Sequence, residues 1–182
     1  MRADAKKNYD RLLAVAQEAV AEHGADLSLR DVARRAEVGL GTLYRHFPTR
    51  EALLEALLRT HFESLAARAA ALTTSNSSEE ALVLWLEETI LFTYSHRGVL
   101  GLMMGAIEDP ESALHSSCVT LRAAGASLLA RAQSEGKARQ DIDGDDLFAL
   151  IAALAWVREQ PGAAARADHL FKVIASALFT AP

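Results

Sequence analysis

The chain has 182 residues, of which 51% are hydrophobic and 24% charged, with a formal net charge of −5. This length allows one protomer with a sizeable buried core, and few aromatics with much Ala and Leu predict an all-α protein. The single Cys118 excludes an intrachain disulfide and a thiolate metal cluster. No apolar run is long and continuous enough to cross a bilayer, and no signal peptide precedes Tyr9, so we expect a cytoplasmic protein.

The charge is unevenly distributed along the chain. Residues 1–50 hold nine Lys and Arg against seven Asp and Glu, whereas residues 51–182 hold ten against seventeen. Because a partner senses the local charge at its contact surface first, a locally basic first segment is compatible with nucleic-acid binding. A mildly positive segment is also typical of an ordinary solvated surface.

Residues 1–24 predict an amphipathic helix that begins with a basic tip and ends at Gly24. Lys6 and Lys7 lie in the tip, where they either face solvent or reach phosphate groups. The apolar residues that recur at helical spacing are Leu12, Leu13, Val15, Ala16, Ala19 and Val20. This stripe is expected to form the core beneath the helices that follow.

Two short helices are predicted next. Ser28 followed by Asp31 is a capping signal that opens a helix over residues 29–36. A second helix is predicted from about Gly39 to the residue before Pro48. A tight turn at residues 37–39 joins them into a helix-turn-helix unit, whose second helix can lie in the major groove of DNA.

The second short helix has an apolar side and a polar side. Leu43 and Phe47 are four residues apart and are predicted to be buried. The residues left to face outward are Thr42, Tyr44, Arg45 and His46.

These residues carry a family resemblance. The stretch L-R-D-V-A-R-R-A-E-V-G-L-G-T-L-Y-R-H-F at 29–47, followed by T-R-E-A-L-L at 49–54, resembles the DNA-binding domain of TetR-family transcriptional regulators. The resemblance covers about the first third of the chain. Gly39 stands where Ser is common at the turn, and Arg50 where Lys is common before the Glu.

The resemblance implies an N-terminal three-helix DNA-binding domain (1–50), a connecting helix (about 49–72) and a C-terminal helical ligand-binding and dimerisation domain (73–182). It implies a homodimeric regulator, expected to be a repressor, that binds a palindromic double-stranded operator and is released by a small apolar effector. The residues expected at DNA are Arg30, Leu40, Gly41, Thr42, Tyr44, Arg45, His46 and Arg50, with Lys6 and Lys7 reaching phosphates.

The remaining chain also reads as helices. Thr49 is expected to cap a helix that ends near Leu72, and the polar run at 73–78 is the clearest linker. Acidic residues at 143–146 are favourable at a helix N-terminus. The segments expected to be helical are 79–96, about 111–136, the stretch that follows the acids and ends at Gln160, and 163–179, with an apolar, Gly-punctuated and Met-rich run at 98–107.

An apolar effector pocket is predicted beside the long middle helix, with Met103 and Met104 as its best candidates because flexible thioethers suit adaptable pockets. The full predicted lining is Trp85, Phe92, Leu102, Met103, Met104, Ile107, His115, Cys118 and Arg122. Ordinary core packing is the alternative interpretation of each of these residues, and Cys118 reads as a small buried hydrophobe or as a redox-sensing thiol.

The last two helices are apolar on more than one side, which predicts a symmetric dimer interface. One stripe of the first helix is expected to face its own core: Leu147, Leu150, Ile151 and Leu154. The second stripe is expected to face a partner: Phe148, Ala152, Ala155 and Trp156. The last helix adds Phe171, Ile174 and Leu178, and the resemblance places the dimer interface in these same two helices.

Other chemistries find little support in the sequence. The six histidines are scattered without metal-ligand spacing, and no motif assembles a nucleophile, a base and an orienting group. We therefore predict no metal, no cofactor and no enzymatic activity. A helical binding module whose first domain has lost DNA binding, and a helical hydrolase or metal enzyme, are the competing hypotheses.

Overall fold

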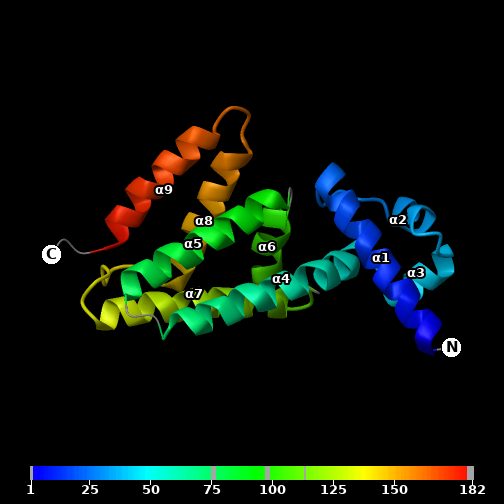
Figure 1. The fold of residues 1–182 in the computed structure, drawn as a ribbon, viewed down its shortest axis with the longest axis horizontal. Helices are drawn as coiled ribbons and strands as arrows, with labels where there is room; N and C mark the ends of the chain where they lie inside the picture. Colours follow the sequence, from blue (N-terminus) through cyan, green and yellow to red (C-terminus); the bar gives the residue numbers. More distant parts are fainter. Residues whose placement is uncertain (1, 75–76, 97–98, 113, 180–182) are drawn as a thin grey trace. The chain divides into compact units, whose positions relative to one another are not determined.

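The computed structural model describes residues 2–74, 77–96, 99–112 and 114–179. The predicted all-α class is confirmed, since these ranges contain nine helices and one isolated β-bridge, between Ala138 and Phe179 (Figure 1). The helices are α1 (Arg2–His23), α2 (Leu29–Arg35), α3 (Leu40–His46), α4 (Arg50–Leu72), α5 (Ser78–Ser95), α6 (Val99–Glu108), α7 (His115–Ser134), α8 (Gly144–Glu159) and α9 (Ala164–Leu178). Within the described ranges, none of them combines the length and hydropathy needed to cross a bilayer.

The helices divide between two compact units. The first unit comprises Met1–His61 and His96–Ser117, and the second comprises Phe62–Ser95 and Cys118–Pro182. The division falls within α4, at the end of α5 and within α7. The domain boundary expected from the sequence lies at 73–78.

The largest difference from the helix boundaries expected from the sequence is at the start of α7. The helix expected from about residue 111 begins only at His115. Before it, the Asp109 carboxylate accepts from the Glu111 backbone N–H (3.0 Å), and the Ser112 hydroxyl accepts from that of Leu114 (3.3 Å), which stabilises a turn after Pro110. The polar run at 73–78 ends one residue early, because Ser78 begins α5, and residues 75–76 lie outside the described part.

The first unit has an apolar core made by one side of each of its first four helices. Leu12, Val32, Leu43, Leu53 and Leu54 are fully buried. They pack in one cluster with Ala16, Ala19, Val20, Ala25, Leu27, Ala33, Ala36, Val38, Phe47 and Leu57. The apolar stripe predicted on the first helix is therefore the surface against which α2 and α3 pack.

The core of the second unit is organised around Trp85 on α5. Its indole is 1% exposed and donates a 2.9 Å hydrogen bond to the Leu65 carbonyl of α4. A Cβ at Gly125 of α7 would lie 2.5 Å from the indole ring, so α7 can approach Trp85 only because residue 125 lacks a side chain.

Helices α8 and α9 form a hairpin that packs on α5 through α8 (Figure 1). Asp143 caps α8 by accepting from the backbone N–H groups of Asp145 (2.8 Å) and Asp146 (3.1 Å). The Asp146 side chain accepts in return from the Asp143 backbone N–H, at 3.1 Å, which completes a capping box.

Candidate nucleic-acid interface

The turn between α2 and α3 is fixed by local contacts. The Ser28 hydroxyl caps α2 by accepting from the Asp31 backbone N–H at 3.4 Å, as the sequence predicted. The Val38 backbone N–H donates to the Ala33 carbonyl at 3.0 Å. Between them, Glu37 has a φ of 53°, the left-handed conformation that usually favours glycine. Its carboxylate accepts a 2.8 Å hydrogen bond from Arg11 of α1.

The inner side of α3 rests on α1. Leu43 and Phe47 are buried, as predicted from their spacing. Tyr9 of α1 lies against Phe47 with ring centroids 5.1 Å apart, and edge-on to His46 at 5.8 Å. These aromatic contacts support the C-terminal end of α3 from below.

The outer side of α3 presents a bare backbone flanked by polar groups. Tyr44 is 47% exposed, although its neighbour Leu43 is completely buried. Gly41 is exposed, and a Cβ placed there would meet nothing within 4 Å. Arg45 folds back along the helix, with Nε donating to the Gly41 carbonyl (3.2 Å) and Nη2 to the Thr42 hydroxyl (3.4 Å). The fold therefore does not itself require a glycine at position 41.

The other residues expected at DNA also have solvent-accessible side chains in the first unit. Arg30 is exposed near the start of α2, and Leu40, Thr42 and His46 are each partly exposed on α3. Lys6 and Lys7 are exposed on α1.

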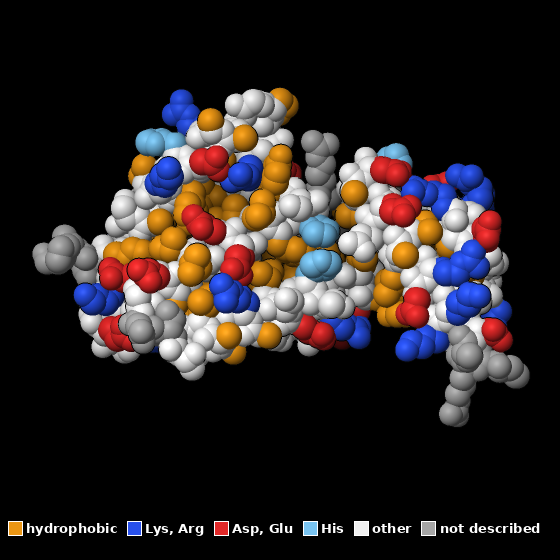
Figure 2. All heavy atoms as spheres, viewed as in Figure 1, with side chains coloured by type: hydrophobic (Ala, Val, Ile, Leu, Met, Phe, Trp, Pro, Cys, Tyr) orange, Lys and Arg blue, Asp and Glu red, His pale blue; other side chains and the backbone are white. Residues whose placement is uncertain are grey.

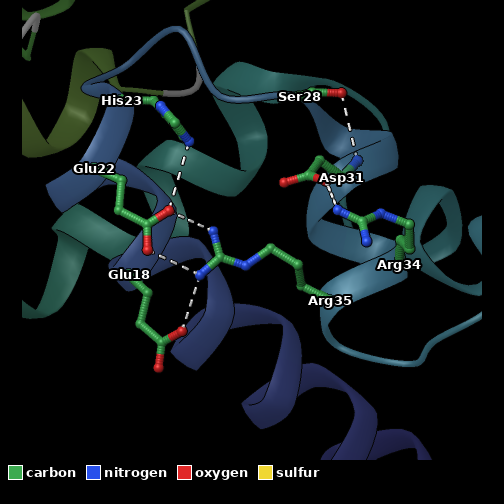
Figure 3. Close-up of polar contacts among 7 residues, drawn as sticks. All are labelled: Glu18, Glu22, His23, Ser28, Asp31, Arg34 and Arg35. Carbon is green, nitrogen blue, oxygen red and sulfur yellow. Dashed lines mark hydrogen bonds and ion pairs between the residues drawn. The ribbon is translucent and has the colours of Figure 1, made fainter.

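Several arginines of this unit are paired with its own carboxylates. Arg35 contacts Glu22 at 2.7 Å and Glu18 at 3.1 Å, bridging α2 to α1, and Arg34 pairs with Asp31 within α2 (Figure 3). The hydrogen bond from Arg35 lowers the pKa of the Glu22 carboxyl, and that from Arg34 lowers the pKa of Asp31. Basic and acidic side chains are accordingly interspersed over α1 to α3 (Figure 2).

Arg50, the expected phosphate contact at the start of α4, is also paired. Its guanidinium lies 3.0 Å from Asp26 and 3.4 Å from Glu51. The Thr49 hydroxyl accepts from the Ala52 backbone N–H at 3.1 Å and caps α4, as predicted. Asp26 is 93% exposed, so a phosphate can displace it from Arg50 without breaking any buried contact.

Four supporting residues were absent from the sequence-based site: Tyr9, Arg11, Asp26 and Glu37. Tyr9 lies three residues before Leu12 on the apolar stripe of α1, and that spacing is the signal that could have identified it. Arg11 is 26 residues from its partner Glu37, and Arg50 is 24 residues from Asp26. No spacing rule predicts pairs so distant.

The predicted effector-pocket residues are divided between the two units. Met103 is buried in the first unit, where Met104 is 42% exposed and His115 Nδ1 lies 2.8 Å from the Ala106 carbonyl oxygen. Ile107 is partly exposed in the same unit, and the Leu102 side chain lies outside the described part.

The second unit holds the rest of the predicted lining. Phe92 packs edge-on against Phe62 with centroids 5.5 Å apart, and Arg122 pairs with Asp145 at 3.0 Å. Trp85 and Cys118 are buried. Burial raises the pKa of the Cys118 thiol to about 11, which keeps it protonated at neutral pH and favours a packing role over a reactive one.

The predicted dimer stripe of α8 is only partly available on the protomer. Phe148 and Ala155 are buried within the second unit, whereas Trp156 is 57% exposed and Ala152 is partly exposed. On α9, Leu178 is buried, Phe171 and Ile174 are partly exposed, and Val173, outside the predicted set, is 48% exposed. Phe148, Ala155 and Leu178 are buried, so they cannot contact a partner unless these helices repack.

Two family models match this sequence. Residues 12–57 match "Bacterial regulatory proteins, tetR family", and residues 77–179 match "Transcriptional regulator SbtR-like, C-terminal domain". The HTH-type transcriptional regulator SAR2658 of Staphylococcus aureus (strain MRSA252) is 28% identical over 108 residues, which are 55% of each chain. The match thus spans about half the length of this curated relative.

Solved structures resemble the chain over nearly its whole length. The TetR transcriptional regulator SCO0520 from Streptomyces coelicolor is 31% identical with a TM-score of 0.67, covering 96% of this chain and 99% of that one. A TetR transcription regulatory protein from Mycobacterium vanbaalenii is 30% identical with a TM-score of 0.62, covering 98% and 99%.

Proposed function

Because the chain belongs to the TetR family of transcriptional regulators, with a DNA-binding helix-turn-helix, we propose that it is a homodimeric repressor. In this proposal the dimer binds a palindromic operator, one α3 in the major groove of each half-site, and a small effector releases it. The proposal rests mainly on the exposed outer side of α3. Gly41 leaves the backbone bare beside exposed Tyr44, although packing of the chain does not require a glycine there.

The side chains suggest separate roles at DNA. Arg30 is exposed and carries a planar set of donors that can bind guanine O6 and N7 together, so we assign it base recognition. Tyr44 has one hydroxyl on an exposed ring, which suits a phosphate oxygen. The bare Gly41 allows the DNA backbone to come close to α3.

The dimer is proposed to form through the outer face of the α8–α9 hairpin. Trp156 and Val173 are large apolar side chains that are about half exposed, one on each helix of the hairpin. Ala152 and the exposed Ala149 and Ala153 lie on α8 near Trp156, and their small size would allow a second α8 to approach closely. This surface replaces the buried Phe148, Ala155 and Leu178 as the proposed partner contact.

Selection of bound duplexes from a random pool tests this function directly. We expect an inverted repeat, because two α3 helices related by a twofold axis read the same half-site in opposite directions. A matched selection with the variant Arg30→Ala, which loses the proposed base contact but keeps the phosphate contacts, controls for DNA retained through general charge. Failure of the native protein to enrich any sequence over this control would overturn the proposal and favour a helical binding module without DNA recognition.

A further inference from the structure

The second unit contains a cleft of about 400 Å³ between α5, α8 and α9, separate from the outer face assigned to the dimer. Its lining residues are Glu87, Ile90, Leu91, Leu154, Arg158, Ala167, Asp168, Phe171 and Lys172. We propose that this cleft binds small amphipathic carboxylates, with the apolar body inside and the carboxylate at Arg158. The proposal rests on the proposed function for its regulatory role, and on the following contacts for its chemistry.

The inner walls of the cleft are apolar. Ile90 and Leu154 are buried at 5% and 4% exposure, Ala167 at 3%, and Phe171 is partly exposed beside them. The same Ile90, Leu154 and Phe171 also line a narrower, wholly apolar crevice that continues between the three helices. That crevice holds only about 10 Å³. The hydrocarbon body would therefore occupy the cleft itself, where burial of apolar surface favours its binding.

The mouth of the cleft is charged. Four of its lining side chains are ionisable, Glu87 on α5, Arg158 on α8, and Asp168 and Lys172 on α9. Figure 2 shows hydrophobic side chains gathered over α5, α8 and α9, with acidic and basic side chains around them. An apolar interior with a few polar groups at one end is typical of a site that orients an amphipathic ligand.

The depth of Arg158 in the cleft indicates that the ligand has a negatively charged head group. Its side chain is 26% exposed, against 55% for that of Asp168, so the deeper charge is positive. One amino group donates to Asp168 at 2.6 Å, and the guanidinium carbon lies 5.4 Å from the centre of the Tyr94 ring, which fixes its position.

The guanidinium of Arg158 also has hydrogen-bonding capacity left. In the described part of the chain, its Nε is buried without a hydrogen-bond partner. A buried donor without a partner is unfavourable, so an oxygen acceptor that exchanges with Asp168 would remove this cost after a small shift of the side chain. A carboxylate supplies two such oxygens, whereas an ammonium head group would meet a positive charge.

The cleft and the proposed dimer surface use different residues of the hairpin. The cleft includes Arg158, Asp168 and Lys172, whereas the outer face presents Trp156 and Val173. A protomer can therefore hold a partner and a ligand together, which a ligand-responsive dimer requires.

The test is calorimetric titration of the full chain with decanoate below its micelle concentration. Decanol and decyltrimethylammonium are the matched probes, with the same hydrocarbon body and a neutral or positive head. We expect decanoate to bind at least about tenfold more tightly than either, because a hydrogen bond to a charged group is among the stronger ones. Equal binding of the three probes, or no binding of decanoate, overturns the proposal.

Two pairs of variants test whether decanoate binds in this cleft or elsewhere on the protein. Leu91→Trp should abolish decanoate binding, whereas Leu84→Trp, on the same helix and similarly exposed but outside the cleft, should not. Arg158→Gln should weaken binding by about tenfold, and Arg139→Gln, which removes the exposed ion pair with Asp141, should leave it unchanged.

Asp168→Asn distinguishes recognition from mere structural support. It removes the intramolecular competitor for Arg158, so decanoate should bind several-fold more tightly, whereas a variant that only damaged the fold would bind less. Unchanged binding in both Leu91→Trp and Arg158→Gln overturns the proposal. Operator affinity is measured separately: decanoate that binds in the cleft without releasing DNA supports the cleft and contradicts only its role in the proposed release.

Discussion

The outer side of α3 and the cleft of the second unit are built in opposite ways. The α3 surface comes from seven consecutive residues, with Gly41 bare and Tyr44 exposed above a completely buried Leu43. The cleft takes its residues from three helices up to 85 positions apart, and its central Arg158 is held by Asp168 and Tyr94. A surface on one short helix can be recognised from residue spacing, whereas a site assembled by packing becomes visible only in the fold.

The largest expected effect comes from disrupting the dimer that we propose to form through the second unit. Ala152→Arg places a charge and a long side chain on the outer face of α8, and we expect a helical monomer that loses palindrome binding. Joining two DNA-binding units raises avidity by roughly 10²–10⁴-fold over one unit, and the variant should lose that gain. Sedimentation gives the oligomeric state and gel shift the affinity.

Ala130→Arg is the control for that experiment, since it makes the same substitution at an exposed alanine of α7, outside α8 and α9. A dimeric Ala152→Arg protein would show that the partner meets another surface.

The next effect separates two roles on the first unit. Arg30→Ala should relax base preference at one position of each half-site and cost about 1–3 kcal/mol at the preferred site. Tyr44→Phe removes only the hydroxyl, so it should weaken all duplexes alike. Sequence selection with both variants is the measurement, and identical profiles would contradict the division of roles.

A smaller effect tests whether Gly41 serves the fold or the DNA. Gly41→Ala should raise the free energy of unfolding by up to about 1 kcal/mol, because alanine favours helix and its Cβ meets no neighbour. Operator affinity should fall instead, since the added methyl group occupies the bare surface. Denaturant unfolding and DNA titration on one preparation measure both, and unchanged affinity would mean that DNA does not approach Gly41.

The smallest effect concerns the turn that sets the position of α3. Glu37 has a φ of 53°, so Glu37→Gly should be more stable than Glu37→Ala by about 1 kcal/mol. Both variants lose the contact with Arg11, so their difference isolates the backbone conformation. The comparison is made by denaturant unfolding, and equal midpoints would show that residue 37 relaxes to another conformation at no cost.

The sequence predicts the first unit well because its signals are local. Ser28 at the start of α2, Thr49 at the start of α4 and the Leu43–Phe47 spacing each act within four residues. The start of α7 was missed because side chains of Asp109 and Ser112 bind the following backbone N–H groups and hold a turn. Helical propensity alone does not include that competition.

The second unit shows what pattern alone leaves open. The two apolar stripes of α8 were recognised, but periodicity does not say which neighbour covers which stripe. In the fold, Phe148 and Ala155 are covered within the protomer, and Trp156 is left exposed on the same helix. The cleft escaped prediction for the same reason, since Ile90 and Phe171 become neighbours only when α5 packs on the hairpin.

The ion pairs of the first unit affect how such a protein would search a genome. Arg11, Arg34, Arg35 and Arg50 each already hold a carboxylate of their own chain. A phosphate must displace that carboxylate before it gains the arginine, which reduces the attraction to DNA of arbitrary sequence. Because non-operator sites outnumber operators by many orders of magnitude, weak arbitrary binding leaves more molecules free to find the operator. The ion pairs within α1 to α4 would thus shorten the time that the protein spends bound to non-operator DNA.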